Sequence, residues 1–240
     1  MHLGLLLWSL LPGLLWAHWL YRRDAFQPEP LGLVAKAFGI GMLLTAPAIV
    51  FGGQIRLHLI LESELVPGSW AWAAQASFLT TAPLEEGLKF AAVYLFFFHH
   101  REFDEPIDGL VYAGTVALGF ASAENILYLT RYGAEVLPFR AFLAVPGHFL
   151  FAASFGFAMG LRTAQIAPDT RRLGGPWDLI AGLAFAILAH GAYNFCLILA
   201  QYQNQPLWGW TGALLVLSGL AILWSAFAKR LDALSPFRDT

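Results

Sequence analysis

Long apolar segments alternate with short polar segments along the whole chain. Each apolar segment is close to, or longer than, the roughly 20 residues that an α-helix needs to cross a bilayer. The pattern therefore predicts about seven transmembrane helices, at residues 3–20, 31–53, 71–98, 107–129, 141–161, 177–199 and 207–228. Residues 54–69 are expected to form an outer loop that contains a short interfacial helix.

The composition supports an integral membrane protein. Hydrophobic residues make up 58% of the chain and charged residues only 12%, which a soluble domain of 240 residues could not keep solvated. We therefore expect an all-α, polytopic fold with a single membrane domain over 1–240 and a four-helix core at about 71–199. The net charge of −2 argues against a nucleic-acid partner, so the expected partners are the lipid bilayer and a membrane-protein or peptide substrate.

The distribution of basic residues predicts the orientation. Lysine and arginine are enriched in cytoplasmic loops, and alternate connections of this chain carry ten and three of them. This places the N-terminus outside and the C-terminus in the cytoplasm. The richer set is Arg22, Arg23, Lys36, Arg101, Arg162, Arg171, Arg172, Lys229, Arg230 and Arg238, and the poorer set is Arg56, Arg131 and Arg140.

Four consecutive predicted helices carry charged or strongly hydrogen-bonding groups within the membrane, where such groups are costly and usually functional. At a rise of 1.5 Å per residue, the groups fall at similar depths in the outer part of the bilayer, so one polar cavity can hold them. The set consists of Glu85, Glu86, Lys89, Glu124, Asn125, His148, His190 and Asn194.

These side chains suit the hydrolysis of a peptide bond. A carboxylate in a pocket of low dielectric constant can take a proton from water near neutral pH, and Glu85 and Glu86 are the natural candidates. Lys89 lies one turn further on and would offset the second carboxylate. Histidines and an amide can stabilise the oxyanion of a tetrahedral intermediate or protonate the leaving amine.

The ordered motifs resemble the PrsW family of intramembrane proteases, which is related to the CAAX prenyl proteases and bacteriocin-processing enzymes. The match covers residues 82–195, about half the chain. The motifs are Glu-Glu-x-x-Lys (Glu85, Glu86, Lys89), a Glu105-Pro106-Ile107-Asp108-Gly109 loop, Phe-x-x-x-Glu-Asn (Phe120, Glu124, Asn125), a helix headed by His148, and His-x-x-x-Asn (His190, Asn194).

The resemblance implies a glutamate-dependent endopeptidase in a bacterial cytoplasmic membrane, one that acts on the extracytoplasmic part of an anti-sigma factor. It implies that Glu85 activates water, that Glu86 supports it, and that His190 and Asn194 bind the oxyanion. The related prenyl proteases have histidine at the position of Glu124, so the role of this residue does not follow from the resemblance.

Other interpretations use the same residues. The carboxylates and histidines could bind zinc with one open water position, although the metal-free form is preferred and no cofactor is required. Glu85, Glu86 and Lys89 could form a structural ion pair, and a proton-coupled transporter also buries such groups near the middle of the membrane. A non-catalytic membrane scaffold would tolerate the loss of Glu85. The sequence does not predict the substrate, its cleavage site or the oligomeric state.

Overall fold

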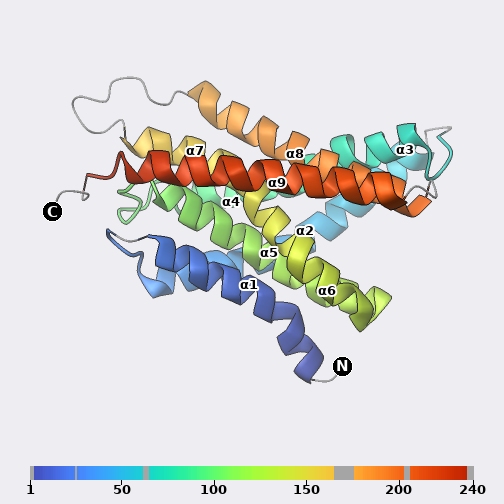
Figure 1. Ribbon diagram of the computed structural model, residues 1–240, viewed down its shortest axis with the longest axis horizontal. Helices are drawn as coiled ribbons and strands as arrows, with labels where there is room; N and C mark the ends of the chain where they lie inside the picture. Colours follow the sequence, from blue (N-terminus) through green and yellow to red (C-terminus); the bar gives the residue numbers. More distant parts are fainter. Residues whose placement is uncertain (1–2, 25, 62–64, 165–175, 203–205, 237–240) are drawn as a thin grey trace.

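The protein is a bundle of long helices that pack around a buried central helix, α5 (Figure 1). The computed structural model describes residues 3–24, 26–61, 65–164, 176–202 and 206–236, and the regular secondary structure in these ranges is entirely helical. The elements are α1 (Leu3–Arg23), α2 (Leu31–Leu61), α3 (Trp70–Ala74), η1 (Gln75–Thr81), α4 (Ala82–Phe96), α5 (Asp108–Tyr132), η2 (Ala134–Val136), α6 (Leu137–Phe139), η3 (Arg140–Ala144), α7 (Val145–Ala164), α8 (Pro176–Tyr202) and α9 (Pro206–Asp232).

The predicted all-α, polytopic fold class is confirmed. Six helical segments among the described residues are long and apolar enough to cross a membrane. The remaining predicted span, 71–98, corresponds to α3, η1 and α4, which follow one another without a break. It does not qualify as a single long apolar helix because α4 has only 15 residues and carries the charged cluster.

The outer-loop prediction for 54–69 is wrong over its first half. Helix α2 continues to Leu61 instead of ending near residue 53, since its apolar residues extend well past the first predicted boundary. Three of the basic residues that predict the orientation, Arg171, Arg172 and Arg238, lie outside the described residues. A fourth, Arg140, is not in a loop but is buried within η3.

Helices α2 and α5 approach each other closely enough for their backbones to touch. A Cβ atom on Gly41 would lie 2.0 Å from the carbonyl oxygen of Val116, and a Cβ atom on Gly119 would lie 2.0 Å from that of Phe38. Glycine is therefore required at this crossing, as at many helix contacts in membranes.

Replacing Gly41 by alanine is expected to destabilise the protein by about 1–3 kcal/mol, because the new methyl group must displace backbone atoms. The matched control is Gly39→Ala on the same helix, where a Cβ atom meets nothing within 4 Å. Thermal unfolding in detergent micelles should show a lower midpoint for Gly41→Ala alone. Equal midpoints for the two variants would contradict the close crossing.

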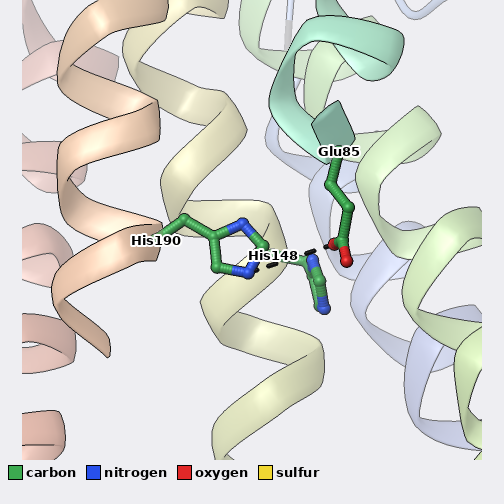
Figure 2. Close-up of side chains that lie close together, drawn as sticks. All are labelled: Glu85, His148 and His190. Atoms are coloured by element: carbon green, nitrogen blue, oxygen red, sulfur yellow. Dashed lines mark ion pairs between the residues drawn. The ribbon is translucent and has the colours of Figure 1, made fainter. Parts of the chain in front are cut away.

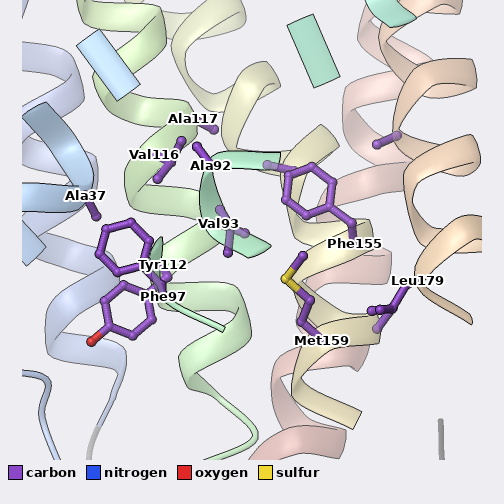
Figure 3. Close-up of a cluster of buried hydrophobic side chains, with 14 of the residues drawn as sticks. Ala37, Ala92, Val93, Phe97, Tyr112, Val116, Ala117, Phe155, Met159 and Leu179 are labelled. Atoms are coloured by element: carbon purple, nitrogen blue, oxygen red, sulfur yellow. The ribbon is translucent and has the colours of Figure 1, made fainter. Parts of the chain in front are cut away.

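An aromatic and aliphatic core fixes α4 against α5 and α7 (Figure 3). The rings of Phe97 and Tyr112 stack with their centroids 4.8 Å apart. Val93, Phe155 and Met159 are fully buried in the same cluster. This core begins one turn beyond Lys89 and holds the charged part of α4 in a fixed position.

Buried carboxyl groups gather where the connection between α1 and α2 meets the start of α5. The hydroxyl of Tyr112 donates a hydrogen bond to Glu29, and the amide of Glu29 donates one to Asp24 over 3.2 Å. Burial raises the pKa of Asp24 to about 7, with a further contribution from the nearby Glu105 carboxyl group. Burial likewise raises the pKa of Glu29 to about 7.

These shifts predict that the protein becomes less stable as the pH rises from about 4 to 7. In the unfolded chain Asp24 and Glu29 have pKa values near 4, so the folded state binds more protons over this range. The midpoint of thermal unfolding in micelles should be higher at pH 5 than at pH 8. In the Glu29→Gln variant, which keeps an acceptor for Tyr112, the unfolding midpoint should depend less on pH. An equal dependence in variant and wild type would exclude Glu29 as a cause.

Candidate active site

Two π-helical segments directly precede the clustered polar residues. Segment η1 leads into α4, and η3 leads into α7. In both cases a proline, Pro83 or Pro146, stands second in the helix that follows. Proline lacks the N–H group of a regular helical hydrogen bond, and π-helical turns occur often at functional sites. Glu85 and His148 each lie two residues beyond one of these prolines, so each distorted turn leads directly to a site residue.

Glu86 links α4 to α8 through a contact with His190. Its Oε1 atom lies 2.8 Å from Nζ of Lys89 and 2.8 Å from Nδ1 of His190. Both Glu86 and Lys89 are completely buried, and the Lys89 ammonium group also lies 4.4 Å from the ring centre of Phe120. The Glu86 carboxylate thus fixes the orientation of the His190 ring.

His148 lies between a cation and a carboxylate. Its Nδ1 atom is 2.9 Å from Nζ of Lys89, and its Nε2 atom is 2.9 Å from Oε2 of Glu124. The lysine has three N–H groups and no acceptor, so Nδ1 accepts and Nε2–H donates to Glu124. The ring centre of His148 lies 5.2 Å from that of His190.

Arg140 holds the other side of Glu124. Its guanidinium donates to Glu124 over 2.9 Å and to Oδ1 of Asn125 over 2.6 Å, and it lies 3.9 Å from the ring centre of Tyr128. The amide of Asn125 donates in turn to the carbonyl oxygen of Ser9 in α1. The Glu124 carboxylate is therefore fixed by η3 and α7 together.

The cluster carries more carboxylates than permanent cations. Glu85, Glu86 and Glu124 face only two such cations, Lys89 and Arg140, which leaves one negative charge when the histidines are neutral. The excess lies at Glu85, because Glu86 and Glu124 each have a cation within 2.9 Å, whereas the buried Oε2 atom of Glu85 accepts no hydrogen bond from the described residues. The nearest permanent cation is Nζ of Lys89 at 3.8 Å. Glu85 is thus the carboxylate that is available to a proton, a water molecule or a cation.

A cavity of about 760 Å³ adjoins these groups and leaves room for a peptide segment. Among its walls are α3 and η1, the end of α5, η3, and the last turns of α8. Five of the sequence-predicted site residues line this cavity, namely Glu85, Glu124, His148, His190 and Asn194. The other three, Glu86, Lys89 and Asn125, lie behind this wall and hold the lining residues in place.

Three of the lining residues have the composition and spacing of a metal-ligand set. Figure 2 shows Glu85, His148 and His190 converging from α4, α7 and α8. Each offers one ligand atom, and these atoms lie within 4.8 Å of one another. Two imidazoles with a carboxylate are a frequent zinc-binding set. Each histidine is also anchored to a carboxylate through its other ring nitrogen, as metal-binding histidines usually are.

A model of known proteases matches most of the chain. The family model described as PrsW family intramembrane metalloprotease matches residues 29–227. The chain belongs to the PrsW family. The resemblance that the motifs predicted is therefore confirmed, and the match extends well beyond the residues that carried it.

Curated relatives agree with this assignment. Protease PrsW of Geobacillus kaustophilus is 38% identical over 218 residues, covering 91% of this chain and 87% of the relative. Protease PrsW of Bacillus subtilis is 37% identical over 186 residues, covering 78% and 79%. Protease PrsW of Clostridioides difficile is 27% identical over 238 residues, covering 97% and 92%. No solved structure matches the chain. These relatives support intramembrane proteolysis as the activity of this PrsW family member.

Sequence analysis missed Arg140 as a site residue. Its position just before the predicted span at 141–161 predicts a loop charge. In the structure it is only 9% exposed and pairs with Glu124. The signal that could have identified it is its spacing, because Arg140 precedes His148 by eight residues, about two helical turns, and so shares its face.

Proposed function

We propose that this PrsW family protein hydrolyses a peptide bond of a membrane-protein substrate in the cavity beside Glu85, and that Glu85 activates the attacking water. The observation that carries the proposal is the Glu85 carboxylate itself. It is buried, has an oxygen that accepts no hydrogen bond from the described residues, and lies at the surface of a peptide-sized cavity. A carboxylate in this environment is well suited to take a proton.

The proposed reaction has two steps. Glu85 takes a proton from water while the water oxygen bonds to the carbonyl carbon of the substrate. The resulting oxyanion accepts hydrogen bonds from the amide of Asn194 and from Nε2–H of His190. The C–N bond then breaks, and the proton on Glu85 passes to the leaving nitrogen. Since Nδ1 of His190 already faces Glu86, this role requires His190 to carry both ring protons.

A second candidate is metal-dependent proteolysis, which the distances among Glu85, His148 and His190 favour together with the description of the family as metalloproteases. A bound Zn²⁺ would supply Lewis-acid activation of water. In this case both histidines would be neutral, and the metal ligands would be Nε2 of His190 and Nδ1 of His148. The Lys89 ammonium group, now 2.9 Å from Nδ1 of His148, would have to turn away.

The test is proteolysis by the purified protein in liposomes against a library of single-span membrane peptides, with metal content measured after treatment with a chelator. Cleavage that survives complete metal removal supports the glutamate mechanism. Cleavage that is lost on chelation and restored by Zn²⁺ supports the metal site instead. Absence of cleavage of every peptide, with and without added Zn²⁺, would contradict both.

We also propose that the protein lies in a bacterial cytoplasmic membrane with its N-terminus outside and the cavity in the outer half of the bilayer. The excess of basic residues at one set of helix ends supports this orientation. An anti-sigma factor, with its single span and extracytoplasmic part, is the substrate class that the PrsW family resemblance suggests. Accessibility of single cysteines placed at the two termini, measured in intact cells, tests the orientation.

A further inference from the structure

A second cavity, of about 710 Å³, lies between α1, α7 and α9. Its walls are almost entirely apolar and include Trp16 of α1, Phe149 of α7, and Leu214, Leu217, Ser218 and Ala221 of α9. The spacing of the α9 residues places them on one face of that helix. The cavity is a lengthwise groove that spans about 15 Å of α9, or half the hydrocarbon thickness of a bilayer.

The groove is closed at one end and widens toward the other. At the closed end the rings of Trp19 and Trp224 lie 4.9 Å apart, and Arg23 forms an ion pair with Asp232 over 3.1 Å. From there α1 diverges from α9 toward its N-terminus, and the end of α7 that joins α6 lies between them (Figure 1). The wide end of the groove is therefore the end at which the active-site cavity lies.

The groove and the active-site cavity are neighbours that share a wall. Leu143 in η3 lines both of them. On α9, Trp210 lines the active-site cavity, and Leu214, one turn later, lines the groove. The rings of Phe139 and Trp210, which both line the active-site cavity, lie 5.6 Å apart. An occupant of the groove would thus lie one side chain away from the catalytic cavity.

We propose that this groove docks the transmembrane helix of the substrate, so that the segment beside it enters the active-site cavity past Leu143. The proposal rests on the proposed proteolytic function. Helices associate in lipid through close packing at small residues, and Ser218 and Ala221 provide such positions on the exposed face of α9. The hydroxyl of Ser218 also offers a hydrogen bond to a helix packed against it. The convergence of α1 and α9 directs the remainder of the docked helix outward into lipid.

Photocrosslinking tests docking without requiring catalysis. A photoreactive residue is placed at Leu214, inside the groove, or at the adjacent Leu215, which is exposed but does not line it. Both proteins carry Glu85→Gln and are mixed in liposomes with the pooled single-span peptide library. We expect peptide adducts at position 214 at least about ten times more abundant than at 215. Equal yields, or adducts to lipid alone at 214, would overturn the proposal.

Filling the groove tests its use in catalysis. Ala221→Trp should reduce cleavage of single-span peptides at least about tenfold, whereas Ile222→Trp, one residue away on the lipid-facing surface, should not. A short peptide that covers only the cleavage site should be cleaved equally by wild type and both variants. Normal cleavage of single-span peptides by Ala221→Trp would refute docking. If wild type cleaves nothing, the proposed function fails. The crosslinking experiment still shows whether the groove binds single-span peptides.

Discussion

Replacing Glu85 by glutamine is expected to reduce peptide hydrolysis by about 10²- to 10⁴-fold, the usual contribution of a general base. The amide keeps the size of the side chain but cannot accept a proton from water. The fold should be retained, because the buried Oε2 atom accepts no hydrogen bond from the described residues and the substitution removes the excess negative charge of the cluster. The midpoint of thermal unfolding should therefore be equal to that of wild type or higher.

The control for this prediction is Glu102→Gln. Glu102 pairs with the exposed Arg101 in the connection between α4 and α5, away from the cavity, so neither activity nor stability should change appreciably. Cleavage rates of a single-span peptide, measured together with unfolding midpoints, separate loss of chemistry from loss of fold. An active Glu85→Gln protein would contradict the assignment of Glu85 under both mechanisms, since the residue is either the base or a metal ligand.

The helices could be predicted from the sequence because a membrane span has a simple physical requirement, a long apolar run. The rule does not predict where a helix changes its geometry or where it ends. The segment before Glu85 is a π-helix, and α2 extends beyond its predicted end. Neither feature is visible in the apolar pattern of the sequence. Boundaries of this kind depend on packing against other helices, which a single sequence does not reveal.

The grouping of the site residues could also be predicted, because buried charges in lipid must find partners and their depths along four helices were similar. The specific contacts between these side chains could not be predicted. The sequence suggested that Lys89 offsets Glu86, but not that its ammonium group also contacts His148 in a helix 59 residues later. The interhelical contacts of Glu86 with His190 and of Arg140 with Glu124 depend on helix rotation, which follows from packing.

Replacing Lys89 by methionine is expected to destabilise the protein by about 3–5 kcal/mol, the usual cost of leaving a buried charge unpaired. Lys89 is completely buried and is the partner of Glu86 at 2.8 Å. Methionine fills much of the same volume, so the loss would come from the charge rather than from a void. Peptide cleavage should also fall, because Lys89 contacts His148 and holds the Glu86 carboxylate that orients His190.

The double variant Glu86→Gln/Lys89→Met distinguishes charge pairing from packing. If the unpaired carboxylate is the cause, removing it should restore most of the unfolding free energy that Lys89→Met loses, because the pair is then replaced by neutral groups. Cleavage should remain low, since a glutamine accepts a weaker hydrogen bond from His190 than a carboxylate does. Recovery of stability without recovery of activity would mean that the ion pair serves to position the histidines. A double variant as unstable as Lys89→Met alone would show that the lysine acts through its packing instead.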